Sequence, residues 1–276
     1  MRNEFRTDLA LEAHGQLCGT ATRLPGIETE RELLRGLPVD LVAVTDERAA
    51  KLIGKRIGHY YTLSLPPRFE RGSTDFRTAV HASAALLSRC LPKQTRSVLV
   101  AALGNPDITP DALGNLAASG ILVTRHLRDT PDFASFASVA LCRTGVLGTS
   151  GTESAAQIRL LCAELKPDAV LVIDALACSD AERLCRTLQF TDTGIAPGSG
   201  VGNDRPSLDG DTLGVPVVAV GYPTVMDALS SGSGDALFVT PRSIDSLVRS
   251  AARVIAYAVN VTLHGIDVED VDALIG

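Results

Sequence analysis

The segment SVLVAALGNPDITPD, residues 97–111, decides the fold of this 276-residue chain. It begins with an uninterrupted apolar run, which is typical of a strand in a parallel sheet that helices cover on both faces. The same pattern recurs at residues 169–173 (AVLVI) and 215–220 (VPVVAV). Between these runs, helix-spaced apolar residues occupy 74–91 and 152–165. This alternation predicts an α/β fold with a mostly parallel sheet flanked by helices.

The outer parts of the chain extend this pattern. Residues 41–44 and 60–65 are short apolar runs that predict a small N-terminal subsheet. A long, amphipathic packing helix is expected after Thr240-Pro241, because threonine is a favoured N-cap and proline a favoured first helical residue. Residues 267–275 predict a short closing helix, and no repeat or low-complexity linker divides the chain.

Charge and composition exclude several classes of protein. The formal net charge is −6 and basic residues are not clustered, so direct nucleic-acid binding is not expected. No apolar stretch reaches the length of a membrane span, and the N-terminus lacks the apolar segment of a signal peptide. The six cysteines are scattered without a CxxC pair, which favours reduced core cysteines. We therefore expect a cytoplasmic protein with no membrane association.

Two polar loops are the expected place for chemistry. Residues 104–111 (GNPDITPD) follow the strand at Ser97–Leu103, and residues 194–206 (GIAPGSGVGNDRP) follow a strand-like run at Thr187–Thr191. In open α/β sheets, ligands bind in the crevice beyond the carboxyl ends of the strands. Both loops are therefore expected to border one binding crevice.

Each loop region carries an aspartate with two interpretations. Asp111 follows Pro110, where it either complements a helix dipole or takes part in catalysis. Asp192 lies at a strand end before the glycine-rich loop, where it either caps a turn or takes part in catalysis. Two carboxylates in one crevice can have their pKa values pushed apart, so that one activates water while the other stays protonated. Asp111 and Asp192 are therefore the candidate catalytic pair.

Two short motifs in the second loop resemble better-known signatures. Asp192-Thr193-Gly194 matches the tripeptide of pepsin-like proteases, but those enzymes are all-β and need two such tripeptides. The glycine-rich run has the pattern GxGxG without the lysine of a phosphate-binding loop, so a nucleotide site is not expected. Glycine permits close approach to a peptide backbone, which predicts a substrate-binding loop. Its residues are Gly198, Ser199, Gly200, Gly202 and Asn203.

Three further residues could support a site. His126 is either structural or a base or ligand, and Glu153 either begins a helix or points into the site. Asp174 ends a buried strand, where a carboxylate needs a partner or a role. No HExxH or similar spacing is present, so no metal or other cofactor is predicted from motifs.

Several of these segments together resemble the spore germination protease family. They occur in that family's order and cover most of the chain from Phe5 to about Asp245. The segments are FRTDLALEAHG, LGNPDITPDALG, TRHL, GTSGTES, KPDAVLVIDALA, TDTGIAPGSGVGN, LGVPVVAVGYPTVMDA and FVTPRSIDSL.

The resemblance implies an endopeptidase that begins the degradation of small acid-soluble, DNA-protecting spore proteins at germination. It further implies a homotetramer in the forespore or spore core, with a fold related to hydrogenase maturation endopeptidases. The family's two essential aspartates are placed on Asp111 and Asp192. A metal-assisted variant stays open, with Asp111, His126 or Asp192 as ligands. The alternatives are a hydrogenase-maturation-type endopeptidase and a nonenzymatic ligand-binding module.

The resemblance also implies a precursor that removes its own N-terminal segment. The family's substrates are cut after an acidic residue and before an apolar one, and a second acid follows. Residues 6–12 (RTDLALE) have this character, so we expect self-processing between Asp8 and Leu9. Residues 1–8 would then be a propeptide, and residues 9–276 a single α/β peptidase domain.

Overall fold

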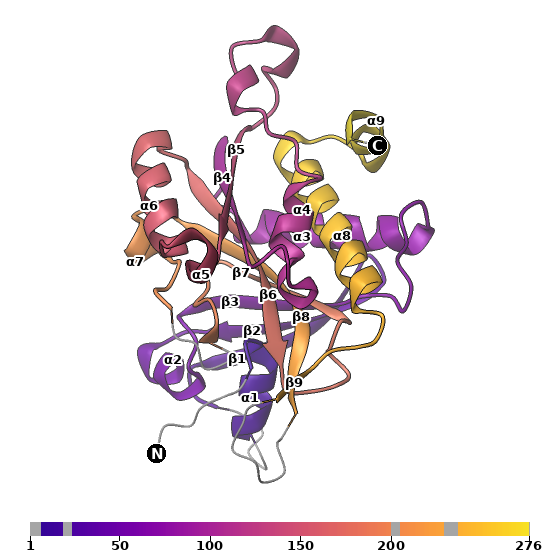
Figure 1. The fold of residues 1–276 in the computed structure, drawn as a ribbon. Helices are drawn as coiled ribbons and strands as arrows, with labels where there is room; N and C mark the ends of the chain where they lie inside the picture. Colours follow the sequence, from indigo (N-terminus) through magenta and orange to yellow (C-terminus); the bar gives the residue numbers. More distant parts are fainter. Residues whose placement is uncertain (1–6, 19–23, 200–204, 229–236, 276) are drawn as a thin grey trace.

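One nine-stranded sheet runs through the computed structural model, which describes residues 7–18, 24–199, 205–228 and 237–275 (Figure 1). Its order is β1-β2-β3-β7-β8-β6-β4-β5, and β9 pairs with the far end of β8. The strands are β1 (Ile27–Leu34), β2 (Leu37–Val44), β3 (Gly58–Ser64), β4 (Ser97–Leu103), β5 (Ser138–Gly145), β6 (Ala169–Cys178), β7 (Thr187–Thr191), β8 (Val217–Ala228) and β9 (Leu237–Val239).

The sheet has a parallel half and an antiparallel half. Strands β8, β6, β4 and β5 are parallel, as the long apolar runs predict. Strands β1, β2, β3 and β7 are antiparallel, and β7 is also antiparallel to its neighbour β8. The N-terminal strands therefore continue the main sheet through the β3–β7 pair instead of forming a separate subsheet. The fold is α/β, with its parallel strands in one half of a mixed sheet.

Helices cover both faces of the parallel half (Figure 1). Alternate residues of β4 point to opposite faces, so that Val98 and Val100 join one core while Leu99 and Ala101 join the other. The first face is covered by α3 (Thr74–Cys90), α4 (Leu113–Ala118) and α8 (Ile244–His264), and the second by α6 (Ser154–Leu165) and α7 (Gly210–Leu213). Helices α1 (Ala10–Cys18) and α2 (Glu47–Ile53) pack on the antiparallel half, α5 (Leu147–Ser150) follows β5, and α9 (Val268–Ile275) closes the chain.

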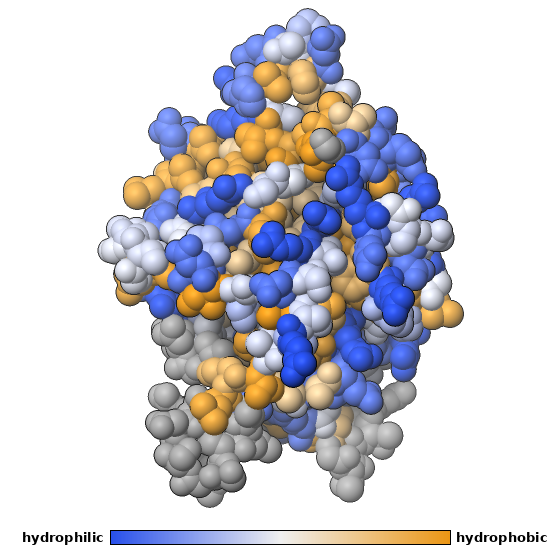
Figure 2. All heavy atoms as spheres, turned by 45° about the vertical axis from the view of Figure 1, so that its right-hand side comes forward, coloured by the Kyte–Doolittle hydropathy of each residue, from blue (hydrophilic) through white to orange (hydrophobic). Residues whose placement is uncertain are grey.

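Helix α8 shows the amphipathic pattern that its sequence predicts. Val248, Ala251 and Ile255 are buried against the sheet, whereas Arg249 and Arg253 are exposed. Figure 2 accordingly shows hydrophilic residues distributed, with apolar ones between them, over the side of the molecule that carries α8 and α9.

The predicted start of α8 is wrong. The helix begins at Ile244, after Ser243, and not at Thr240-Pro241. The Thr240 hydroxyl donates to the Thr224 carbonyl of β8 at 2.9 Å, so threonine is tied to the sheet instead of capping the helix. The Ile244 N–H donates to the Pro241 carbonyl at 3.0 Å, which forms a turn before the first helical residue.

The remaining features bear on cysteine chemistry and membranes. All six cysteines are free, and Cys90, Cys162, Cys178 and Cys185 are buried. None of the helices in the described part of the chain combines the length and apolar character needed to cross a bilayer.

Candidate active site

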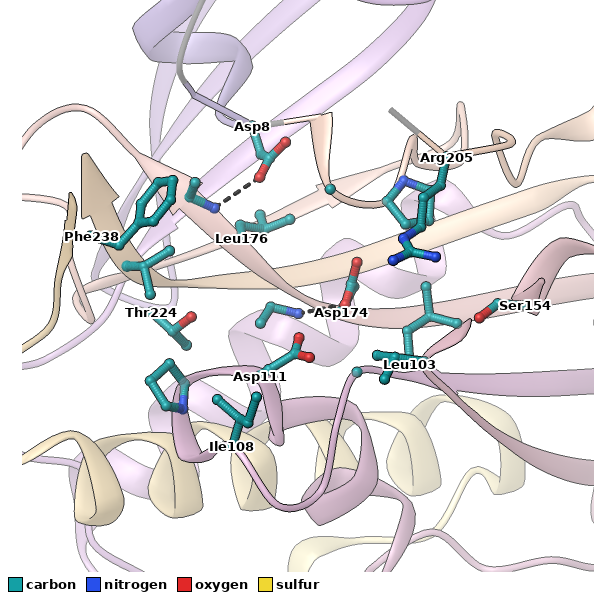
Figure 3. Close-up of a pocket in the computed structure, with 18 of the residues that line it drawn as sticks. Asp8, Leu103, Ile108, Asp111, Ser154, Asp174, Leu176, Arg205, Thr224 and Phe238 are labelled. Carbon is teal, nitrogen blue, oxygen red and sulfur yellow. Dashed lines mark hydrogen bonds between the residues drawn. The ribbon is translucent and has the colours of Figure 1, made fainter. Parts of the chain in front are cut away.

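A cavity of about 540 Å³ lies beyond the carboxyl end of β4 and beside β6 (Figure 3). Its walls come from the loop after β4, from β6, from the loop after β7, and from the outer part of β8 with β9. Three carboxylates line it, those of Asp8, Asp111 and Asp174. This is the position at which open α/β sheets bind ligands.

Asp111 is held at the cavity by the tight turn that follows β4. Gly104 has a φ of +96°, and a Cβ there would lie 1.9 Å from the Asp111 carbonyl oxygen, so glycine is required. The chain then forms a short 3₁₀ helix at Thr109–Asp111, and the Asn105 N–H donates to the Asp111 carboxylate at 2.7 Å. The motif GNPDITPD thus folds back on itself to aim one carboxylate into the cavity.

Asp174 lies within β6 and is nearly buried, at 6% exposure. Its position in the sheet is opposite Gly221 of β8. Its carboxyl group accepts the Ala175 N–H at 2.9 Å. Figure 3 shows Asp174 and Asp111 on the same side of the cavity, with Asp8 across it.

The two carboxyl groups have unequal electrostatic surroundings. Burial raises the pKa of Asp111, while the Asn105 N–H and the Arg205 guanidinium partly offset that rise. Burial raises the pKa of Asp174 well above its usual value, and the nearby carboxylates of Asp111 and Asp8 raise it further. Both pKa values are therefore raised, and that of Asp174 has the added contribution of two neighbouring carboxylates.

Helix α4 packs unusually close to strands β4 and β6, which lead to Asp111 and Asp174. A Cβ at Gly114 would lie 2.5 Å from the Leu103 carbonyl oxygen and 2.7 Å from that of Ile173. Glycine at this position lets the helix backbone contact β4 and β6 directly. It therefore helps to set the spacing between Asp111 and Asp174.

Asp192 does not share this cavity with Asp111, so the prediction of a common crevice for that pair is contradicted. Strand β7 runs antiparallel to β8, and Thr191 pairs with Ala219 near the start of β8. The carboxyl end of β7 therefore lies toward the edge of the sheet opposite the cavity. There Asp192 accepts the His59 N–H at 2.8 Å and lies 2.8 Å from the His59 ring nitrogen Nδ1. It joins the end of β7 to the start of β3.

His126 and Glu153 have different positions relative to the cavity. His126 is exposed in a short 3₁₀ helix (Arg125–Leu127) between α4 and β5 and does not line the cavity. Glu153 precedes α6 and lies 3.5 Å from the guanidinium of Arg205, which does line it. Glu153 thus contacts a residue of the cavity wall without lining the cavity itself.

The predicted substrate loop is partly described. Gly198 lines the cavity, and the Ser199 hydroxyl donates to the Asp8 carboxylate at 2.7 Å. Gly200, Gly202 and Asn203 lie outside the described residues. The described part of the loop contacts the N-terminal segment, which is consistent with a peptide-binding role.

Of the two residues at the predicted cleavage point, Asp8 lines the cavity and Leu9 does not. Asp8 contributes to its wall, and Leu9 is fully buried against Leu176 and Cys178 of β6. The N-terminal segment therefore reaches the cavity through Asp8.

The sequence alone did not single out Arg205, which lines the cavity, or Lys55, which contacts Asp8. Arg205 is the one basic residue of the glycine-rich loop segment 194–206, which was a usable signal. Lys55 lies between α2 and β3, and its ammonium donates to the Asp8 carbonyl at 2.9 Å. Nothing in its local pattern distinguishes it from a surface lysine.

The residues suggested as metal ligands do not come together. Asp111, His126 and Asp192 occupy the cavity, the α4–β5 connection and the β7–β3 junction respectively. Within residues 7–18, 24–199, 205–228 and 237–275, no group of three or more His, Cys, Asp or Glu side chains is placed to hold a metal ion. The proposed ligand set therefore does not fit a metal.

The fold and the cavity define the chain as an α/β protein with a carboxylate-lined site. A family model described as germination protease matches residues 6–236, which shows that the chain belongs to the germination protease family and is a protease.

Individual relatives agree. The chain is 41% identical over 230 residues to a germination protease of Caldanaerobacter subterraneus, covering 82% of this chain and 70% of the relative. It is 34% identical over 320 residues to one of Clostridium tetani, covering 97% and 98%. Among solved structures, a NiFe hydrogenase maturation protease from Thermococcus kodakarensis has a TM-score of 0.37 and 19% identity, covering 63% of this chain and 99% of that one.

Arg205→Leu is expected to move the acidic limb of the pH–activity profile to higher pH. The guanidinium holds the pKa of Asp111 down, so its removal raises that pKa, and Asp111 loses its charge at a higher pH. The measurement is kcat/KM for peptide cleavage against pH. Arg128→Leu, a change at an exposed arginine, is the control and should leave the profile in place. An unshifted limb in Arg205→Leu would contradict the electrostatic role.

Proposed function

We propose that the chain is an aspartate-dependent endopeptidase in which Asp111 and Asp174 form the catalytic pair. The observation that carries this proposal is the pair of carboxyl groups that line one cavity with unequal environments. Asp111, charged, accepts a proton from water as the oxygen adds to the peptide carbonyl carbon. Asp174, protonated, gives its proton to the leaving nitrogen as the carbon–nitrogen bond breaks.

The proposal replaces the pair Asp111 and Asp192 by the pair Asp111 and Asp174. The cavity position of Asp174 and its closeness to Asp111 support the change. The engagement of Asp192 with His59 gives that aspartate a structural role instead.

The biological substrates in this proposal are small acid-soluble spore proteins, and the location is the forespore or spore core. The family membership supports both points. The proposal includes self-processing between Asp8 and Leu9, supported by the position of Asp8 in the cavity wall. It also includes assembly as a homotetramer, which the family resemblance suggests.

Incubation of the purified chain with a small acid-soluble spore protein tests the function. We expect cleavage after an acidic residue, and loss of residues 1–8 from the chain itself, both measured by intact-mass spectrometry. Cleavage should survive exhaustive chelation if the carboxylates act without a metal. A chain that cleaves neither substrate nor itself would contradict the proposal. Removal of any other N-terminal length would contradict the processing site alone.

A further inference from the structure

The N-terminal segment is bound to the end of β6 through the backbone of Asp8. The Asp8 N–H donates to the Ala177 carbonyl at 2.9 Å. The Ala177 N–H donates back to the Asp8 carboxylate at 2.8 Å, the bond drawn at the top of Figure 3. With the Ser199 hydroxyl on its other oxygen, the Asp8 carboxylate has a dedicated donor for each oxygen atom.

The carbonyl group of Asp8 has its own pair of donors. The Lys55 ammonium donates to this oxygen at 2.9 Å and the Gln189 side-chain amide at 3.1 Å. Gln189 also accepts the Ala10 N–H at 2.8 Å, so its side chain is hydrogen-bonded to the backbone on both sides of the Asp8–Leu9 bond. The peptide bond predicted to be cut therefore has the most extensively bound carbonyl oxygen in this segment.

A second carboxylate anchors the same segment. Glu12 is buried, and the Ser179 N–H and hydroxyl donate to it at 2.7 Å and 2.8 Å. These contacts hold the first turn of α1 on the strand end and leave Asp8 in a defined place. The ammonium of Lys55 lies close enough to both carboxylates that Asp8 and Glu12 each raise its pKa, against the larger lowering by burial.

Such a set of donors exceeds what packing of a short helix requires. A carboxylate taken from water is costly unless hydrogen bonds replace its hydration, and here both oxygens of Asp8 receive them. A neutral amide could still accept the Ala177 N–H and donate to the Ser199 hydroxyl, but it would lack the negative charge that strengthens both hydrogen bonds and that lies near the Lys55 ammonium. The arrangement therefore favours a carboxylate over an amide of the same shape through its charge.

We propose that the Ala177 N–H and the Ser199 hydroxyl form the subsite for an acidic residue preceding the cut bond, and that Lys55 and Gln189 are the donors that hold its carbonyl oxygen. This inference rests on the proposed endopeptidase function. The chain's own Asp8 occupies the subsite, and the ligand class is a peptide with aspartate or glutamate at that position.

The chemical step assigns a role to each donor. Water adds to the Asp8 carbonyl carbon and gives one proton to the carboxylate of Asp111. The carbonyl oxygen gains negative charge, which the Lys55 ammonium and the Gln189 amide stabilise. The carbon–nitrogen bond then breaks and its electron pair remains on the Leu9 nitrogen. That nitrogen takes the proton of the Asp174 carboxyl group. The products are a carboxylic acid at Asp8, which loses its proton to solvent, and an amine at Leu9, while Asp111 holds the proton from water and Asp174 has given up its own.

The test of the acid subsite compares two synthetic peptides of residues 4–16, one with the native Asp8 and one with asparagine there. Processed wild-type enzyme should cleave the aspartate peptide about tenfold to hundredfold faster in kcat/KM, as expected for hydrogen bonds to a charged group. Ser199→Ala should reduce that preference several-fold. Ser88→Ala, which removes a hydroxyl bonded to the Ala84 carbonyl of its own helix, is the matched control.

The test of the carbonyl donors uses Lys55→Met. We expect kcat to fall about 100-fold with little change in KM, because the charge of the oxygen develops in the transition state. Lys55→Arg should restore part of the rate, and Lys51→Met on the exposed side of α2 should have no effect. Thermal melting of each variant separates a folding defect from a catalytic one.

The outcomes distinguish this inference from the proposed function. A wild-type enzyme that cleaves neither peptide overturns the function and, with it, the subsite. A wild-type enzyme that cleaves both peptides equally, or folded Ser199→Ala and Lys55→Met variants that match their controls, overturns the subsite alone.

Discussion

Asp174→Asn is expected to lower peptide cleavage by roughly 1,000-fold, and Asp111→Asn by a similar factor, because each removes one proton-transfer group. Asp192→Asn is expected to retain activity within a few-fold, since its carboxylate is bound to His59 away from the cavity. The measurement is kcat/KM on one acidic peptide, together with the intact mass of each variant. If Asp192→Asn is as inactive as Asp111→Asn while Asp174→Asn is active, the proposed pair is wrong.

The thermal stability of Asp174→Asn shows whether a loss of its activity comes from misfolding. Because the pKa of Asp174 is raised in the folded chain above the ordinary value of 3.8, protonation of this group favours the fold. That stabilisation is complete below the pKa of the unfolded chain and is lost as pH rises through the folded pKa. Asparagine carries no charge at any pH. The variant should therefore melt higher than wild type at neutral pH, and the difference should shrink toward pH 4.

Gly114→Ala is expected to destabilise the fold by about 3 kcal/mol or more and to abolish most activity. The added Cβ would lie 2.5 Å from the Leu103 carbonyl oxygen and 2.7 Å from that of Ile173, and backbone atoms cannot rotate away. Relief requires α4 to move off β4 and β6, which separates Asp111 from Asp174. Chemical denaturation and cleavage of the acidic peptide measure the two effects.

Gly15→Ala is the matched control for this substitution. It lies in α1, and a Cβ there would meet no atom within 4 Å. We expect unchanged or slightly higher stability, because alanine favours a helix more than glycine does. Equal stability of Gly114→Ala and wild type would contradict the close contact between α4 and the two strands.

Local patterns predicted the parallel half of the sheet well. The apolar run at Ser97–Leu103 forms β4 with the predicted bounds, and the loop after it carries Asp111 into the cavity. These features depend on near neighbours, namely apolar periodicity, a glycine that permits a tight turn, and a proline before the aspartate. The motifs shared with the germination protease family extended the prediction from fold to activity.

The choice between Asp174 and Asp192 depended on the direction of one strand. Both aspartates follow apolar residues with strand character, and the tripeptide at Asp192 was the more familiar signal. Strand β7 pairs antiparallel to β8, so its end points away from the cavity, whereas β6 is parallel to β4 and brings Asp174 beside Asp111.

The sequence by itself therefore determined the α/β class, the protease family and Asp111 as a candidate, because each rests on short motifs that can be read locally and on their order along the chain. The tertiary structure decided which carboxyl group lies near Asp111 and how Asp8 is bound by Lys55, Gln189 and Ser199. Those contacts join segments that are separated by as many as 191 positions. Their formation depends on strand order and direction, which no local pattern contains.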